Sequence, residues 1–465
     1  MLKIANKNYL LTLLLIALAF NHLDRLAFGL VLQNIKVDLA LSDTQLGIVT
    51  GIAFALFYAT MGIPIARWAD RGNRVAIISV TAALWSGAVV LCAAATTFLQ
   101  LLVIRICAAV GEAGCQPPAL SLIADRFSRA ERPRAVARYL LGFPLALTFG
   151  YFVAGWLNEF WGWRMTFIVL GAPGLVLAVI AALTLQEPRA AAAARDLEHG
   201  RESTGEPSLR QVFMGLWANL AFRHLVFCFS VWCFFGYGIL QWQPAFFVRS
   251  HGMNTGELGT WLSAVYGVGG LIGTYVGGEL ASRYAADNEG LQLRVIAGLF
   301  AMFGVMIAGA YVASDRHVAF AILALSAIGG ALMNGPLFAA TQTLVPPRMR
   351  ATAIAIMFFF ANLIGMGLGP LAVGTLSDAM RPVLHDESLR YALLIFCPGY
   401  LWAAWHAWRC AHHLEGRRME HGPPEPTSEP IEAVLHSAAD ANIDVAVGAH
   451  SAPRERRSRS YGRRI

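Results

Sequence analysis

Apolar residues in this chain come in long runs, each bounded by turn residues or by charges. A helix needs about 20 apolar residues to cross a bilayer, and in hydrocarbon every backbone polar group must be paired inside the protein. The runs are too long for the strands of a membrane barrel. The pattern therefore predicts an all-α membrane protein with twelve transmembrane helices. We expect them at residues 9–32, 44–65, 75–95, 99–124, 135–157, 165–185, 222–248, 258–281, 295–313, 318–345, 351–377 and 391–408.

The composition supports this prediction. Of the 465 residues, 57% are hydrophobic and 14% are charged, and the mean hydropathy of +0.54 is too high for a soluble protein of this length. Lys3 and Lys7 precede the first run as in a signal peptide, but the run continues to Leu32 without a cleavage site, so we expect a retained helix. Seven cysteines without metal-ligand spacing indicate neither a disulfide framework nor a metal site.

Basic residues are unevenly divided between the two sides of the predicted helices. If the amino terminus is cytoplasmic, most Lys and Arg of the connecting segments fall on the cytoplasmic side. The opposite side holds Lys36, Arg164, Arg249, Arg316, Arg381 and Arg390. This asymmetry predicts a multi-pass protein of the inner cell membrane with both termini in the cytoplasm. It also accounts for the net charge of +7 without a nucleic-acid partner.

Two long polar stretches divide the chain. Residues 187–221 form a predicted cytoplasmic linker between an N-terminal six-helix bundle, residues 1–186, and a C-terminal six-helix bundle, residues 222–410. Residues 411–465 are rich in Pro, Glu, Ser and Arg and are predicted to form a disordered cytoplasmic tail. Contact between the tail arginines and anionic lipid is the alternative.

The two predicted bundles are related in sequence. One offset separates Gly51 from Gly267, Gly62 from Gly278, Arg67 from Arg283, and the loop RPRAVA at Arg132 from RMRATA at Arg348. An even number of helices in each repeat gives both copies the same orientation about an axis along the membrane normal. Two similar bundles that face each other suit alternating access.

Four charged residues lie at membrane depth in the first and fourth predicted helices, where a charge is rarely retained without a partner or a task. Asp24 and Arg25 are in the first helix, and Arg105 and Glu112 share one face of the fourth. Asp24 and Arg105 fall at similar depth, roughly 10–13 Å from the outer helix ends at the helical rise per residue. We therefore predict that Asp24 pairs with Arg105 across a central cavity. Glu112 is left near the midplane as the less compensated acid.

Glu112 is the predicted site of proton coupling. Desolvation favours the neutral form of a buried carboxyl group, so Glu112 could take up a proton near neutral pH. The alternative is a static network of all four charges that only holds two helices together. Apolar packing could replace such a network at little cost, which favours the proton or substrate role. His22 lies about 200° around the helix from Asp24 and is expected to face elsewhere.

The segment ARWADRGNRV, residues 66–75, resembles the loop signature of the major facilitator superfamily. Within that superfamily it is similar to the Spinster family, through Asp70, Arg71, Asn73 and Arg74. Further stretches also resemble Spinster proteins: LDR in the first helix, LSDTQLG at 41–47, R-x6-GEA at 105–113, SLIADRF at 121–127 and P-x5-GY-x3-G at 144–155. Ala66 stands where the pattern has Gly, but a small residue still allows close helix contact.

The resemblance implies a major facilitator fold of two six-helix bundles and a secondary transporter. It also implies that Asp70, Arg71 and Arg74 belong to a charge cluster that latches the cytoplasmic side when the transporter is open outward. The alternative is a solvated loop that only follows the positive-inside rule. A lipid-like or amphipathic substrate, and proton coupling through acids at the positions of Asp24 and Glu112, are implied as well.

The second half of the chain offers aromatic and neutral polar residues for such a substrate. The candidates for the cavity wall are Trp232, Tyr237, Gln241, Trp242, Asn334 and Asn362. A cavity charged on one side and apolar on the other suits a molecule with a polar head and an apolar tail. Packing or interfacial anchoring is the alternative role for each aromatic residue.

The chain has no Walker loop, HExxH or GxSxG, so we expect neither enzyme activity nor a cofactor. The predicted function is alternating-access transport by a monomer embedded in membrane lipid, in which protons drive export or exchange of an amphipathic organic solute. One alternative is proton-coupled uptake of a small organic anion, such as an aromatic or sugar acid, with its carboxylate held by Arg105. Another is a membrane sensor that transports nothing.

Overall fold

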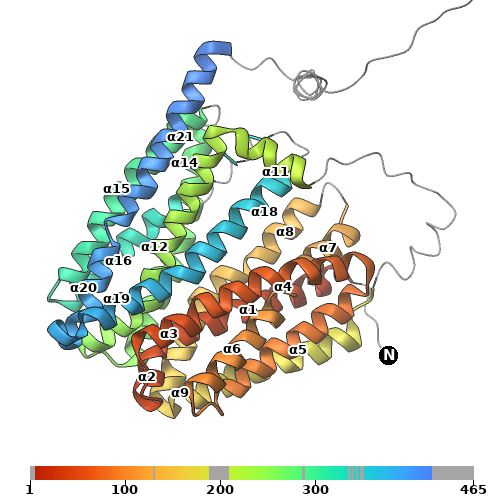
Figure 1. Cartoon of the computed structure of the whole chain (residues 1–465). Helices are drawn as coiled ribbons and strands as arrows, with labels where there is room; N and C mark the ends of the chain where they lie inside the picture. Colours follow the sequence, from red (N-terminus) through yellow and green to blue (C-terminus); the bar gives the residue numbers. More distant parts are fainter. Residues whose placement is uncertain are drawn as a thin grey trace, which may run out of the picture. The chain divides into compact units, whose positions relative to one another are not determined.

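The computed structural model describes residues 6–128, 131–187, 209–284, 288–333, 337, 340–341, 344–345 and 350–421. All regular secondary structure in these residues is helical (Figure 1). The chain separates into two units, Met1–Glu415 and Gly416–Ile465, and both helical bundles lie within the first unit.

Each half of the chain forms a series of helices with short connections. The first half contains α1 (Lys7–Leu30), α2 (Leu32–Asp38), α3 (Asp43–Thr50), α4 (Ile52–Arg71), α5 (Arg74–Cys92), α6 (Phe98–Glu112), α7 (Gln116–Arg126), α8 (Arg132–Leu140) and α9 (Gly142–Thr184). The second contains α11 (Leu209–Ala218), α12 (Leu220–His251), α13 (Thr255–Leu262), η1 (Ser263–Val268), α14 (Gly269–Tyr284), α15 (Glu289–Val312), α16 (Arg316–Leu332), α18 (Arg350–Phe360), η3 (Ala361–Leu368), α19 (Gly369–Leu384), η4 (His385–Glu387), α20 (Ser388–Phe396) and α21 (Gly399–His421).

These elements account for twelve membrane spans. Among the described residues, eight helical stretches are long and apolar enough to cross a membrane, judged by length and composition. Two of them, Arg134–Thr184 with 51 residues and Ala353–Leu414 with 62 residues, each contain two predicted spans. The tenth span begins with the shorter apolar helix Arg316–Leu332, and the eighth is divided among α13, the π-helical η1 and α14. The predicted fold class is therefore confirmed.

Helices occur in part of the predicted linker and beyond the predicted end of the last span. α11 lies inside the predicted linker, where Trp217 stacks on Phe213 and contacts Phe227 and Phe360. Aromatic packing therefore stabilises a helix in a stretch whose composition is polar overall. α21 continues to His421, beyond the predicted end of the last span at residue 408. The rest of the predicted tail, residues 422–465, lies outside the described residues.

The fourth membrane span is broken near its middle. α6 ends at Glu112 and α7 begins at Gln116, whereas the sequence predicted one continuous helix. Pro117 and Pro118, in the first turn of α7, have no backbone N–H and cannot continue the hydrogen bonding of α6. Just before the break, Gly111 lies so close to α5 that a Cβ would come within 2.6 Å of a backbone nitrogen there. The break therefore leaves Glu112 at the end of a tightly packed helix.

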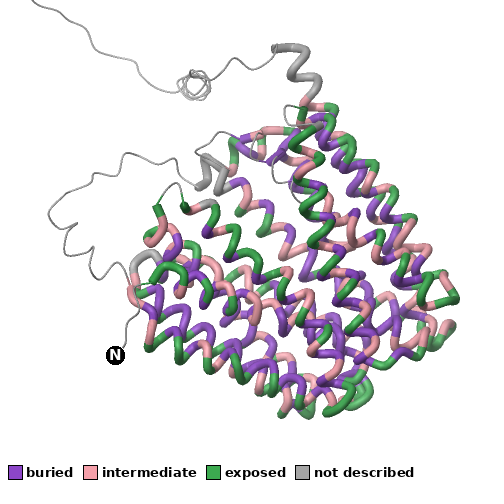
Figure 2. Tube along the Cα trace, turned by 180° about the vertical axis from the view of Figure 1, so that it is seen from behind, coloured by how far each residue is buried: buried purple, intermediate pink, exposed green. Residues whose placement is uncertain are grey.

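Burial follows the pattern expected for helices in lipid. Buried residues form one large core cluster and two smaller ones. Figure 2 shows exposed positions along the outside of the helices. Many of the exposed residues are large and apolar, such as Val305 at 71% and Val179 at 57% exposure. Water would not favour so much exposed apolar surface, whereas hydrocarbon accepts it.

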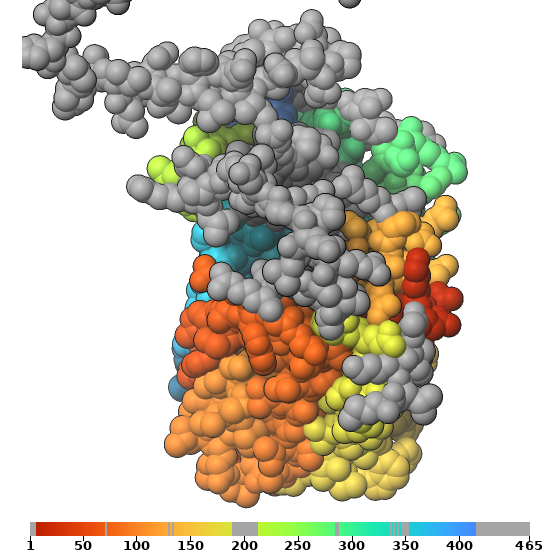
Figure 3. Space-filling view, turned by 90° about the vertical axis from the view of Figure 1, so that its right-hand side faces the viewer, coloured from red at the N-terminus to blue at the C-terminus, as the bar shows by residue number. Residues whose placement is uncertain are grey.

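The two halves form separate sets of helices that meet mainly through two matching contacts, with further contacts of α12 on α1 and α2. Figure 1 shows the first set in red to yellow and the second in green to blue, and Figure 3 shows the first half as one contiguous block. α3 and α4 pack against α19 and η3, and α9 packs against α13 and η1. The first contact joins spans two and eleven, and the second joins spans eight and five, their equivalents in the repeat. The sequence repeat thus appears as a symmetric interface.

Small residues bring α9 and α13 together. A Cβ added at Gly259 would lie 3.0 Å from Cα of Gly155 and closer still to the carbonyl oxygen of Tyr151. Glycine at both positions lets the two backbones approach this closely. Next to this contact, Asn158 Nδ2 donates to Thr255 Oγ1 at 2.9 Å. The bundle interface therefore has little space for a larger side chain here.

We expect Gly259→Ala to weaken the contact between the bundles. The added methyl group must push α9 and α13 apart, and overpacking of this kind costs about 1–3 kcal/mol. The apparent melting temperature in detergent should fall. Gly298→Ala is the matched control, because nothing lies within 4 Å of a Cβ at Gly298 and alanine is the better helix former. Equal stability of the two variants would contradict the close packing.

Candidate site for substrate and protons

Asp24 and Arg105 form a buried ion pair between α1 and α6. Arg105 Nη1 donates to Asp24 Oδ2 at 2.8 Å, and both residues are 2% exposed. This is the pair that matching depth along the two helices predicts. Each charge offsets part of the other's desolvation cost, which neither could bear alone in a membrane.

Glu112 forms a second ion pair, with Arg25. Arg25 Nε donates to Glu112 Oε2 at 2.6 Å, so the prediction that Glu112 is less compensated is wrong. Arg25 follows Asp24 directly and lies about 100° further around α1, from where its long side chain reaches the end of α6. Each acid of the network thus has its own arginine.

Aromatic rings surround both arginines. The Arg25 guanidinium lies 4.5 Å from the ring centre of Phe54 and 4.7 Å from that of Tyr58. The Arg105 guanidinium lies 4.7 Å from Phe28 and 5.0 Å from Phe54. Phe54 therefore contacts both cations, which its π face stabilises. None of these rings is among the residues predicted from the sequence. Phe54 and Tyr58 are one helical turn apart on α4, and this spacing is the sequence pattern that could have indicated them.

The charge network is neither fully satisfied nor fully enclosed. Within the described part of the chain, the buried oxygens Asp24 Oδ1 and Glu112 Oε1 have no hydrogen-bond partner. The Arg25 side chain is 21% exposed, against 3% for Arg105. Arg25 Nη1 also contacts Met366 Sδ of η3 at 3.5 Å, so this arginine reaches the second bundle. A carboxyl oxygen without a partner can accept a proton without the loss of another hydrogen bond.

Two of the predicted cavity residues of the second bundle lie near the first bundle. Gln241 packs against α1 at Gly29, where a Cβ would lie 3.2 Å from Gln241 Nε2. Tyr237 lies one helical turn before Gln241 on α12 and is 38% exposed. These two side chains therefore lie where the bundles face each other.

The other candidates for the cavity wall are placed differently. Trp232 is half-buried and packs against Phe229 and Phe300 of its own bundle. Asn362 is half-buried in η3. Asn334 lies outside the described residues. A role for Trp232 and Asn362 in the wall of a substrate cavity therefore stays a prediction.

Trp242 does not line a cavity in this structure, which corrects the prediction. Its side chain is fully buried, and its Nε1–H donates to the Pro370 carbonyl oxygen at 2.8 Å. The ring also lies against α19, where a Cβ at Gly374 would come within 2.9 Å of it. Trp242 therefore packs α12 onto α19, the alternative role considered for each aromatic residue.

His22 does not take part in the two ion pairs. Its Nδ1 hydrogen-bonds the Leu18 carbonyl oxygen of the preceding turn at 3.1 Å, and its ring meets the Phe143 ring edge-on at 5.2 Å. Across the described ranges, no group of three or more His, Cys, Asp or Glu side chains could hold a metal ion.

Arg74 joins the ends of several helices in the first bundle. It is fully buried, and its guanidinium bonds Asp125 Oδ2 at 2.6 Å and Glu187 Oε1 at 2.5 Å. Asp70 and Arg71 are the last two residues of α4, and their side chains are outside the described structure. The predicted cytoplasmic latch of these three residues therefore stays a prediction.

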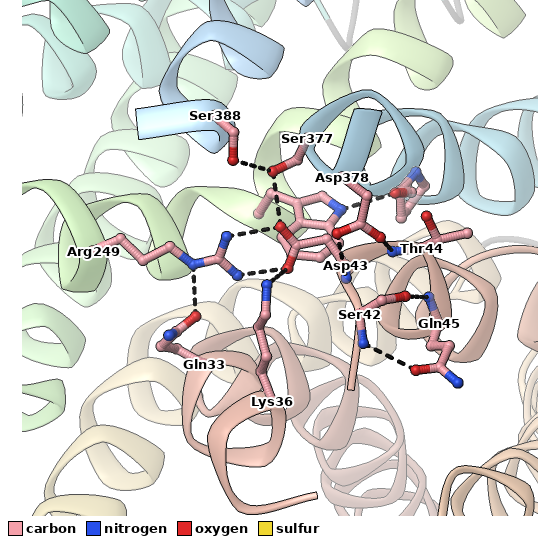
Figure 4. A network of polar contacts seen from close by, with 12 residues as sticks. Gln33, Lys36, Ser42, Asp43, Thr44, Gln45, Arg249, Ser377, Asp378 and Ser388 are labelled. Atoms are coloured by element: carbon pink, nitrogen blue, oxygen red, sulfur yellow. Dashed lines mark hydrogen bonds and ion pairs between the residues drawn. The ribbon is translucent and has the colours of Figure 1, made fainter. Parts of the chain in front are cut away.

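A third group of charges joins the two bundles at the end that the sequence predicts to face outward. Asp43, fully buried at the start of α3, accepts from Arg249 Nη2 at 2.7 Å and from Nη1 at 2.8 Å. Lys36 Nζ donates to Asp43 Oδ1 at 2.5 Å, and Ser377 Oγ donates to Oδ2 at 2.8 Å. Figure 4 shows Asp43 enclosed by these groups. We call Lys36, Asp43, Arg249 and Ser377 the Asp43 latch.

Local sequence places Asp43 in the latch. Ser42 and Gln45 form a capping box, with Gln45 N donating to Ser42 Oγ at 3.1 Å. Asp378 of the second bundle accepts from the backbone N–H groups of Asp43 at 3.1 Å and Thr44 at 2.7 Å, which a helix start leaves free. The Asp43 latch was not predicted from the sequence. The Ser-x-x-Gln pattern before an apolar run indicates the helix start that positions Asp43.

The chain is similar to known transporters along most of its length. The model of the Major Facilitator Superfamily matches residues 14–370. An MFS-type efflux pump of Mycolicibacterium smegmatis is 34% identical over 379 residues, which cover 81% of this chain and 85% of that protein. A hexuronate transporter of Bacillus subtilis is 24% identical over 383 residues, which cover 78% of this chain and 86% of that protein.

A solved structure resembles the chain closely in fold. The crystal structure of a bacterial homolog of the human lysosomal transporter Spinster, in an inward-facing and unoccupied conformation, matches with a TM-score of 0.77 and 28% identity, over 90% of this chain and 99% of that chain. The predicted resemblance to Spinster proteins is thereby confirmed. The matching proteins are transporters and not enzymes. This multi-pass membrane protein is therefore a secondary transporter that belongs to the major facilitator superfamily.

Proposed function

We propose that this transporter exports or exchanges an amphipathic organic solute by alternating access, and that protons drive the cycle. The observation that carries the proposal is the presence of two ion pairs, Asp24–Arg105 and Glu112–Arg25, buried side by side and in contact with the second bundle. Apolar residues would hold helices together at lower cost than buried charges. Similarity to a protein named as an efflux pump supports export.

Glu112 is the proposed proton carrier. Its free oxygen Oε1 can accept the proton, and protonation removes the negative charge that holds Arg25. Arg25 in turn contacts Met366 of the second bundle. A change in protonation at Glu112 therefore acts on the interface between the bundles, which has to switch between two arrangements during transport.

The two bundles offer different surfaces to a substrate. The first bundle supplies the partly exposed Arg25 and the ring of Tyr58 beside it. The second supplies the neutral polar groups of Tyr237 and Gln241, and Asn362 on η3 is a further candidate. A molecule with a polar head and an apolar body matches this division.

A small organic anion is the second candidate substrate. Similarity to a hexuronate transporter supports it, and so does the presence of arginine at the site. Arg25 suits this role better than the predicted Arg105, because Arg105 is almost fully buried against Asp24. Membership in a transporter family favours either candidate over a sensor that transports nothing.

The proposal keeps the predicted membrane arrangement. The excess of Lys and Arg in the loops supports cytoplasmic termini and insertion in the inner cell membrane. The exposed apolar surface supports contact with lipid. A monomer is the proposed working unit, since the two bundles of one chain supply the whole site.

Glu112→Gln should abolish solute transport driven by a pH gradient in liposomes, while exchange of labelled for unlabelled solute continues. Glutamine keeps the shape of the side chain but cannot bind the transported proton. Transport is measured across a series of pH values, and an unchanged pH profile in the variant would rule out Glu112 as the carrier.

Glu131→Gln is the matched control for this experiment. Hydrogen bonds with the Ser128 backbone and Lys7 lower the pKa of Glu131 to about 2, so this exposed carboxylate stays ionised throughout the physiological range. Its replacement should leave the pH profile of transport unchanged.

Variants of the Asp24–Arg105 pair test whether the role of the pair is structural or functional. Arg105→Gln leaves Asp24 buried without a partner and should reduce the free energy of unfolding by about 3–5 kcal/mol. The neutral double variant Asp24→Asn/Arg105→Gln should recover most of this loss, measured as melting temperature in detergent. We expect the double variant to fold and yet to lose proton-driven transport. Full transport by this protein would show that the pair only holds α1 to α6.

Thermal-shift measurements distinguish the two substrate candidates. We expect a zwitterionic amphiphile to raise the melting temperature of the protein in a saturable way, because a ligand stabilises the state that it binds. A hexuronate should have no effect. The reverse result, abolished in the neutral variant Arg25→Gln/Glu112→Gln, would establish the organic anion instead.

A further inference from the structure

A small pocket lies directly beside the Asp43 latch. Its wall consists of Gln33, Lys36, Arg249, Arg381, His385, Asp386 and Ser388, and it contains about 260 Å³ of space including its open mouth. The pocket is small and open to the surface, so a phosphate or carboxylate group can enter it. The pocket is separate from the two central ion pairs, with which it shares no residue.

Positive charge dominates the pocket wall. Lys36, Arg249 and Arg381 are cations at neutral pH, His385 can become one, and Asp386 is the acid among them. Asp43 is fully buried behind Lys36 and Arg249 and adds nothing to the pocket surface. On the pocket wall itself, three cations therefore face one acid.

The cations have hydrogen-bonding capacity left. Lys36 Nζ donates to Asp43, which uses one of its three donors. Arg381 is exposed and forms no ion pair with any residue that the structure describes. Burial, followed by the repulsion of Arg249, lowers the pKa of Lys36, and Arg381 adds to the effect. An anion in the pocket would relieve this repulsion.

The pocket is built from both bundles. Gln33 and Lys36 belong to α2 of the first bundle, whereas Arg249 at the end of α12 and Arg381 on α19 belong to the second. Arg249 Nε donates to Gln33 Oε1 at 2.6 Å across this boundary. The two halves of the wall come together only while the bundles touch at this end. A ligand of the complete pocket therefore binds this conformation better than one in which the bundles are apart.

We propose that this pocket binds an anionic oxygen group, a phosphate or a carboxylate, and that the bound anion clamps the latched end of the transporter shut. Ser388 connects the pocket to the latch, because its hydroxyl lies 3.2 Å from that of Ser377, which donates to Asp43. The anion is a regulator and not the transported solute. The inference rests on alternating access, but on neither the proposed proton carrier nor the proposed substrate.

The distance between the bundles at the latched end tests this clamp directly. Spin labels at Leu99→Cys on α6 and Val312→Cys on α15 lie on exposed positions of the two bundles, away from the pocket. Cys107 is replaced by serine, since the other cysteines are buried. In detergent, inorganic phosphate should increase the population with the short distance in a saturable way, compared with sodium chloride at equal ionic strength.

Variants of Arg381 connect the effect to the pocket. Arg381→Gln should weaken the phosphate effect at least tenfold in concentration, and Arg381→Lys should restore most of it. Arg316→Gln is the matched control, because Arg316 is a partly exposed arginine at the same predicted face that pairs with Glu257 outside the pocket. An equal loss in the Arg316 variant would reduce the effect to general surface charge and overturn the proposal.

The same distance measurement in lipid nanodiscs distinguishes a lipid headgroup from a free anion as the ligand. If anionic phospholipid alone produces the short distance and phosphate adds nothing, the pocket holds a lipid headgroup. If phosphate acts equally in neutral and anionic nanodiscs, it holds a free anion. No change of the distance distribution with either phosphate or anionic lipid would overturn the proposal, whether or not the protein transports protons.

Discussion

A charge buried in a membrane has to be neutralised by a neighbour, and the centre of this transporter depends on that constraint. Asp24 and Glu112 are each matched by an arginine, and the ring of Phe54 contacts both cations. Because removal of any one charge strands its partner, the network is expensive to alter. In the proposed cycle, a single proton at Glu112 frees Arg25 from this network.

The same physical rule applies at the end of the bundles, with a different consequence. The Asp43 latch joins residues from the two bundles. In the proposed alternating-access cycle, its ion pairs separate and become hydrated as the bundles move apart. The close packing of Gly155 on Gly259 adds van der Waals contacts between the bundles. These contacts also form and break without any covalent change. Closure therefore combines specific geometry with reversibility, which alternating access requires. The central ion pairs, in contrast, lie within the first bundle, so movement of the bundles alone does not separate them.

Sequence reasoning succeeded where position along a helix was sufficient. Hydrophobic run lengths gave the twelve spans, and equal depth gave the pairing of Asp24 with Arg105. It failed where the reach of a side chain or a local break decided the outcome. Arg25 extends to Glu112, although its backbone position alone does not indicate this. Pro117 and Pro118 end the predicted fourth helix early, and Trp242 is turned into its own bundle and not toward a cavity.

The sequence by itself determined the fold class, the twelve spans, the repeat and the four charges at membrane depth, because each of these follows from hydrophobicity and spacing along a helix. Only the tertiary structure decided that Arg25 pairs with Glu112, which rings lie over the cations, and how Asp43 meets Arg249 across the interface. Those contacts join residues that are far apart in the chain. They depend on helix rotation, helix breaks and side-chain reach, which the order of residues does not state.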